Sequence, residues 1–86
     1  MNNKSISEIL VRGSIEEYEI LPACNEIAAA GHVCILKMDG ARQDNSISII
    51  ISFPDDPQRA IRMDCEDLLK GFFGVLEKYQ SDVVSR

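Results

Sequence analysis

The sequence predicts a small single domain of the α+β class, spanning residues 1–86, with the element order α-β-β-β-α. Three patterns predict this class. Residues 46–53 alternate between apolar and polar side chains, as a half-buried strand does. Residues 65–79 repeat apolar side chains at three and four positions, which is typical of an amphipathic helix. Residues 5–31 carry helix-starting and helix-ending signals, so we expect a helical N-terminal third, then a three-stranded antiparallel sheet, then a C-terminal amphipathic helix packed on the sheet.

In the N-terminal third, two Ser-x-x-Glu sequences, beginning at Ser5 and Ser14, are typical of capping boxes at helix starts. Gly13 and Gly31 stand where a first short helix and an alanine-rich helix would end. After the second box, three apolar residues have the spacing of one helix face: Ile15, Tyr18 and Leu21. Pro22 either kinks that helix or opens the next one. One kinked helix and several short helices therefore both fit this region.

The middle of the chain predicts three strands. Residues 32–38 are apolar on both faces, and a polar turn begins after them at Asp39. In residues 46–53 one face is apolar and consists of Ile47, Ile49, Ile51 and Phe53. The other face holds Ile50 and three serines, and we expect it to be solvated. Residues 59–63 fit a third strand with Ile61 and Met63 pointing inward.

The last helix is predicted to begin at a cluster of acids. Asp64 is expected at its N-cap, with Glu66 and Asp67 in the first turn, where the helix dipole favours carboxylates. The face expected to be buried carries Leu69, Phe72, Phe73 and Leu76. Gly71 and Gly74 indicate close packing against a neighbouring element, simple tolerance of glycine in the helix, or a groove for a partner.

The charge of the chain restricts its partners. The net charge is −5 and the basic residues are scattered, so we expect neither direct nucleic-acid binding nor attachment to an anionic membrane surface. The α-β-β-β-α order also occurs in double-stranded-RNA-binding domains. Those domains carry basic residues where this chain has Asp64, Glu66 and Asp67, so RNA would be repelled. The order alone identifies no family.

The residues that carry most enzyme chemistry are scarce. The chain has three cysteines and one histidine, no C-x-x-C pair, no calcium-loop spacing and no phosphate-binding loop. His32 lies beside Cys34 without a third orienting group in the sequence, so we expect no catalytic dyad. We therefore predict a protein that is not an enzyme and has no metal, cofactor or disulfide. The first residues do not resemble a signal peptide, and reduced thiols suit a cytoplasmic protein.

The acids form the strongest functional signal. They occur in three clusters that we predict to bind a partner: Glu16, Glu17 and Glu19; Asp55 and Asp56; Glu66 and Asp67. Asp55 and Asp56 stand between prolines and have no capping role, so we expect the largest effect on association there. The sequence thus favours a small acidic inhibitor that binds a basic nucleic-acid-handling protein stoichiometrically, as toxin-immunity and phage anti-defence proteins, including anti-CRISPR-like inhibitors, do. The alternative is an assembly module that homodimerises through a sheet face or edge.

Overall fold

The computed structural model describes residues 5–85, so both ends of the predicted 1–86 domain lie outside the described residues. In chain order the elements are α1 (Ser5–Arg12), the 3-10 helix η1 (Glu17–Glu19), α2 (Ile20–Ala29), β1 (Val33–Met38), β2 (Ile47–Ser52), β3 (Ile61–Cys65) and α3 (Leu68–Ser85). This confirms the predicted α-β-β-β-α order and the α+β class. In the N-terminal third, the chain forms several short helices instead of one kinked helix.

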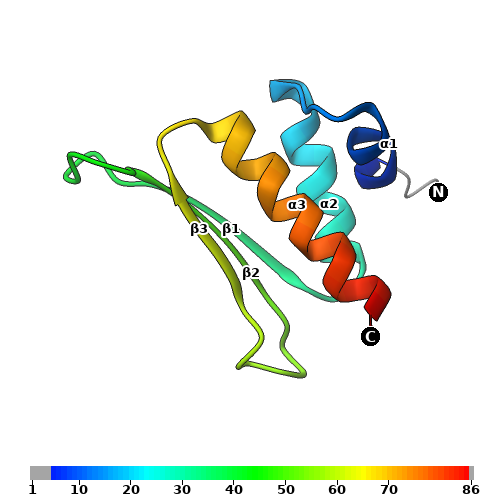
Figure 1. The fold of residues 1–86 in the computed structure, drawn as a ribbon. Helices are drawn as coiled ribbons and strands as arrows, with labels where there is room; N and C mark the ends of the chain where they lie inside the picture. The colour runs from blue at the N-terminus through cyan, green and yellow to red at the C-terminus, as the bar shows by residue number, and fades with distance from the viewer. Residues whose placement is uncertain (1–4, 86) are drawn as a thin grey trace.

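The sheet is antiparallel, with β2 between β1 and β3. Leu36 pairs with Ile49, and Ile49 pairs with Met63, so these three side chains share one face. Figure 1 shows the helices gathered on one side of the sheet. We call the side without helices the open face; it carries Val33, Ile35, Lys37, Ser48, Ile50, Ser52, Arg62 and Asp64.

The core fills the space between the sheet and the helices. Its fully buried members include Ile49, Ile51 and Phe53 from the sheet side and Phe72 and Leu76 from α3. This confirms the predicted inward face of β2 and the role of α3 in covering the sheet. Two other residues of the predicted buried face, Leu69 and Phe73, are only partly buried against the core.

The ends of the first helices follow the glycine signals. Gly13 (φ 89°) donates its N–H to the Ile9 carbonyl at 2.9 Å, and Gly31 (φ 89°) donates to the Ala28 carbonyl at 2.9 Å. Both positions lie in the left-handed region that favours glycine, which confirms both predicted helix ends. Pro22 lies in the first turn of α2, which begins at Ile20.

The predicted helix face through Tyr18 and Leu21 is wrong. These side chains are 77% and 73% exposed, whereas Ile20 is buried. The reason is that residues 14–16 are not helical, so Ile15 does not share a helix face with Tyr18 and Leu21. The second capping box is also displaced: the Glu16 N–H donates to Glu19 Oε1 at 2.8 Å, so this box begins at Glu16 and not at Ser14.

The predicted start of the last helix is wrong by several residues. Asp64 and Cys65 belong to β3, where they pair with Ser48 and Ile47 of β2. The strand ladder continues to Cys65 and holds both residues in extended backbone. Asp67 takes the capping role instead, because its Oδ1 accepts the Lys70 N–H at 3.2 Å at the start of α3.

The two glycines of α3 lie against β3. A Cβ atom at Gly71 would lie 2.3 Å from Cys65 Sγ, and one at Gly74 would lie 3.3 Å from Met63 Cε. Close packing against a neighbouring element, one of the alternatives from the sequence, therefore explains Gly71.

Candidate functional site

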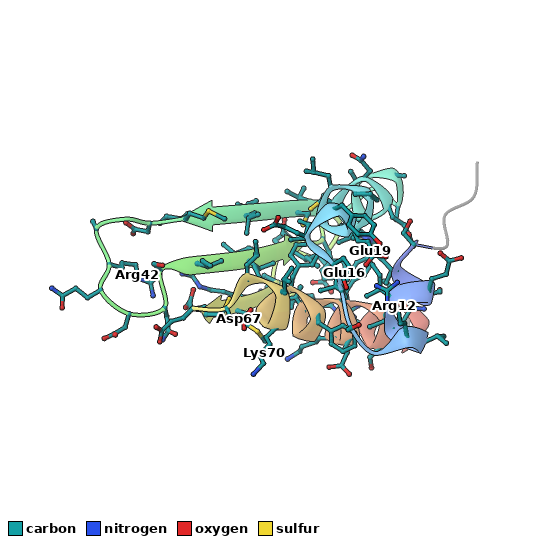
Figure 2. The ribbon with its side chains drawn as sticks, turned by 90° about the horizontal axis from the view of Figure 1, so that it is seen from above. Arg12, Glu16, Glu19, Arg42, Asp67 and Lys70 are labelled. Carbon is teal, nitrogen blue, oxygen red and sulfur yellow. The ribbon has the colours of Figure 1, made fainter. Side chains whose placement is uncertain are left out.

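The fold brings two of the three predicted acidic clusters to one end of the helix layer. The helices α2 and α3 both begin at that end, as Figure 1 shows. A shallow cavity of about 210 Å³ also lies here, lined by residues 13–15, which precede the first cluster in the chain, and by the first turns of α3, which follow the second. Figure 2 looks onto this end of the molecule. We call its four carboxylates, Glu16, Glu17, Glu66 and Asp67, the acidic pole.

The cavity itself is mainly apolar. Ile15, Leu69 and Phe73 line it together with Gly13, Ser14 and Lys70. Ile15 is buried and belongs to the core, whereas Leu69 and Phe73 are only partly buried. Their incomplete burial gives the acidic pole an apolar centre. Lys70 is the one basic residue of this lining, so the end is acidic without being uniformly negative.

Glu19 has a structural role beside the acidic pole. Its carboxylate forms an ion pair with the Arg12 guanidinium and accepts the Glu16 N–H at 2.8 Å. Arg12 also donates to the Ser14 carbonyl at 2.8 Å. The Arg12 hydrogen bond, followed by the Glu16 N–H, lowers the pKa of Glu19. This predicted contact residue therefore joins α1 to the start of η1.

The acidic pole combines a cap with exposed charges. Asp67 is committed to the α3 N-terminus through the Lys70 N–H. Glu16, Glu17 and Glu66 are exposed, so their charges face solvent. Carboxylates near helix N-termini are also stabilised by the helix dipole, which allows several negative charges at this end.

The third predicted cluster, Asp55 and Asp56, lies apart from the acidic pole. The turn that holds it precedes β3, whereas Glu66 and Asp67 follow β3 at its other end. The turn is ordered, because the Asp56 N–H donates to the Phe53 carbonyl at 2.8 Å. Arg59 Nε lies 3.9 Å from Asp56 Oδ2 and offsets part of the charge. The predicted binding residues thus divide between two ends of the molecule.

Asp64 forms a polar cluster on the open face, which the sequence pattern does not predict. The Ser48 hydroxyl donates to Asp64 Oδ1 at 2.6 Å, and Arg62 Nη2 lies 3.3 Å from the same oxygen. Arg42 from the β1–β2 loop donates to Ser48 Oγ at 3.3 Å. The Ser48 hydroxyl and then Arg62 lower the pKa of Asp64. Ser48 is only 1% exposed, so the expectation of a fully solvated serine face is wrong at this position.

The thiols and the histidine are arranged in separate contacts. Cys24 Sγ of α2 lies 3.5 Å from Cys34 Sγ of β1. His32 Nδ1 lies 2.7 Å from the Tyr79 hydroxyl, and its ring meets Phe53 edge-on at 4.7 Å. A thiol hydrogen bond from Cys34 lowers the pKa of Cys24 to about 7, although burial opposes it. The same bond and burial raise the pKa of Cys34.

The surface of β1 is apolar. Its exposed side chains are Val33, Ile35, Leu36 and Met38, which lie on both faces of the strand. The signal was present, because residues 32–38 are apolar on both faces. A strand of that kind is fully covered only when both of its faces are packed.

Among residues 5–85, no group of three His, Cys, Asp or Glu side chains is placed to hold a metal ion. In that same part of the chain, no helix is both long and apolar enough to cross a membrane. Comparison of the chain with protein-family models, with curated proteins and with solved structures found no match.

Proposed function

We propose that this chain is a non-enzymatic binding protein that docks its acidic pole onto a basic protein. One observation carries the proposal: a single apolar cavity is lined by residues 13–15, which directly precede Glu16 and Glu17, and by the first turns of α3, which directly follow Glu66 and Asp67. Charge at the rim accelerates association and selects against partners of the wrong sign. An apolar centre supplies the desolvated contact that a stable interface needs.

The chemistry of this end describes the partner segment. The cavity wall of Ile15, Leu69 and Phe73 suits one apolar side chain of a partner. The exposed carboxylates of Glu16, Glu17 and Glu66 suit lysine or arginine on either side of it. The partner is therefore a protein with an apolar residue flanked by basic residues on its surface.

Basic surfaces of this kind are common in proteins that handle nucleic acids, where they bind phosphates. A protein carboxylate surface that occupies such a groove acts as a stoichiometric inhibitor. This is the mode of toxin-immunity proteins and of phage anti-defence proteins, including anti-CRISPR-like inhibitors. The cytoplasm is the compartment that fits this role, because three thiols stay reduced there.

The test compares two variants of equal net charge. The first, Glu16→Lys/Glu17→Lys/Glu66→Lys, reverses the exposed charges of the acidic pole. The matched control reverses three exposed acids elsewhere: Glu8→Lys/Asp44→Lys/Glu77→Lys. Wild type and both variants are used to capture proteins from host lysate. The captured protein is then purified, and its binding rates and its own activity are measured against each variant.

We expect wild type and the control to capture the same basic protein and the pole variant to lose it. Association should be slower by about tenfold or more for the pole variant than for wild type. Association of wild type should also slow as salt is added. Inhibition of the captured protein should be complete at one chain per target. Equal capture by the pole variant, or a partner without a basic surface, would contradict the proposal.

A further inference from the structure

Within residues 5–85, β1 pairs with β2 alone, so its other edge presents unpaired backbone groups at known positions. The Asp39 N–H donates to the Ser46 carbonyl at 2.8 Å, so residue 39 is directed toward β2. Hydrogen bonding alternates along an antiparallel strand, so Val33, Ile35 and Lys37 are also directed toward β2. The intervening residues direct their N–H and C=O groups outward; they are Cys34, Leu36 and Met38.

This edge lacks the usual protection against pairing with another strand. Edge strands are commonly guarded by charges, proline or bulges. The pairing of β1 with β2 is continuous from Val33 to Met38, and its one charged residue, Lys37, lies 3.9 Å from Asp39. The opposite edge differs, because the outward positions of β3 are the charged residues Arg62 and Asp64.

We propose that two copies of this chain pair antiparallel through their β1 edges, about a two-fold axis beside Leu36. The pairing joins the two three-stranded sheets into one continuous sheet. In this register Leu36 faces Leu36 of the second copy, and Cys34 faces Met38. All three outward residues then form hydrogen-bonded pairs, each of which exchanges two backbone hydrogen bonds. A shift by two residues in either direction leaves one outward residue without such a partner.

The side chains complement one another in the same register. Directly opposed residues of an antiparallel pair share a face, so Leu36, Cys34 and Met38 form an apolar seam on the helix side. Met38 is 64% exposed in one copy. In the pair, Met38 of one copy lies opposite Cys34 of the other. Cys24 of α2 packs on Cys34, so α2 of that second copy covers Met38 of the first.

The open face and the charges are compatible with this pairing. Ile35 lies opposite Lys37 of the second copy, whose aliphatic stem can cover it. Figure 2 shows β1 along one margin of the sheet, with the labelled Asp67 beside the opposite margin. Each copy carries a net charge of −5, so the two copies repel one another. Added salt screens that repulsion, so self-association strengthens with salt, in contrast to the docking of a basic protein.

The first test is mass as a function of concentration, by sedimentation equilibrium. Wild type should reach twice the 9.6 kDa of one chain. Met38→Lys places a charge on each side of the seam, and Leu36→Pro removes an outward N–H without breaking the β1–β2 ladder. Each should weaken the dimer by about tenfold or more. Val11→Lys, at an 89% exposed residue of α1, is the control that should leave the dimer unchanged.

The second test locates the contact by amide hydrogen exchange. The amides of Cys34, Leu36 and Met38 should gain protection as concentration rises, whereas those of Ile35 and Lys37 should be protected throughout. A 9.6 kDa mass at every concentration overturns the proposal. So does a dimer that survives Met38→Lys, or one that forms without protection of the Leu36 amide. None of these outcomes depends on binding by the acidic pole.

Discussion

Gly71 is a residue whose identity is set by a neighbouring strand and not by its own helix. In a helix interior glycine is about 1 kcal/mol less favourable than alanine. A Cβ atom at this position would lie 2.3 Å from Cys65 Sγ and 3.1 Å from Cys65 Cβ. Glycine therefore lets α3 approach β3 closely. The sequence indicates close packing here, but it does not identify Cys65 as the contact, because the helical spacing predicts that residue in the same helix.

Gly71 and Gly74 make a matched pair for a stability measurement. Gly71→Ala should lower the free energy of unfolding by about 1–3 kcal/mol, the usual cost of overpacking, because both Cys65 Sγ and Cβ must move. The Cβ atom of Gly74→Ala meets only the flexible end of Met63, so this substitution should raise the free energy of unfolding by up to about 1 kcal/mol. Urea denaturation measures both. Adding Cys65→Ala to Gly71→Ala should restore the free energy of unfolding that Gly71→Ala loses. If it does not, the added methyl group does not clash with the Cys65 thiol.

Cys24 is the thiol expected to react first. The Cys34 hydrogen bond lowers the pKa of Cys24 to about 7, while burial raises the pKa of Cys65. Since the thiolate is the nucleophile, alkylation of Cys24 should accelerate as pH rises through about 7 and then level off. Rates read by peptide mass spectrometry from about pH 6 to about pH 9 test this.

Cys34→Ala removes the donor and should return the midpoint of Cys24 alkylation toward the ordinary value of 9.0. Cys65→Ala is the control and should leave the midpoint unchanged. Under denaturing conditions, all three thiols of wild type should react, as the absence of a disulfide predicted from the sequence requires. A count of one reactive thiol would indicate a disulfide within the chain, which Cys24 and Cys34, with sulfur atoms 3.5 Å apart, are placed to form.

At the scale of elements, alternation over residues 46–53 predicted β2 well, because one face of that strand is covered by the core. The start of α3 is harder to predict, because Cys65 fits both the two-residue repeat of a strand and the spacing of a helix face. It continues the alternation of Ile61 and Met63, and it also precedes Leu69 at helical spacing. Pairing with β2 decides in favour of the strand. That long-range contact is not visible in a local pattern, so the cap was assigned to Asp64 instead of Asp67.

The corrected cap can be tested with a neighbour of equal charge. Asp67→Ala should lower the free energy of unfolding by about 1 kcal/mol, because the Lys70 N–H loses its acceptor. Glu66→Ala removes the same charge beside the helix but no capping bond, so it should cost clearly less. Urea denaturation of both variants decides between them. Equal losses would indicate that charge near the helix N-terminus matters more than the hydrogen bond.

At the scale of the whole molecule, the exposed features occupy different places. The acidic pole lies where α2 and α3 begin, the Asp55–Asp56 turn lies at the far end of β3, and the apolar edge lies along β1. The sequence could identify all three segments from composition. It could not tell which acids share a surface, because the meeting of residues 13–15 with α3 depends on tertiary packing. The same limit hid the edge position of β1.

Because these surfaces differ in charge, salt should affect them in opposite directions. At low salt, attraction assists the docking of a basic protein on the acidic pole, while the net charge of −5 on each copy opposes pairing of β1. Raising salt from about 0.05 M to about 0.5 M shortens the screening length well below the size of the molecule. Binding of the captured protein should weaken by about tenfold or more over that range, and the dimer should become stronger.

Sedimentation equilibrium and binding rates on the same salt series measure both effects, with Asp55→Lys/Asp56→Lys compared against the pole variant. The variant whose binding of the captured protein depends least on salt identifies the end of the molecule that binds. If that is the turn variant and not the pole variant, Asp55 and Asp56 form the binding surface, as expected from the sequence, and the acidic pole does not. A dimer that weakens with salt would mean that acids of one copy meet basic residues of the other. Such a contact is ionic and cannot be the apolar β1 seam, whose outward residues Cys34, Leu36 and Met38 carry no charge.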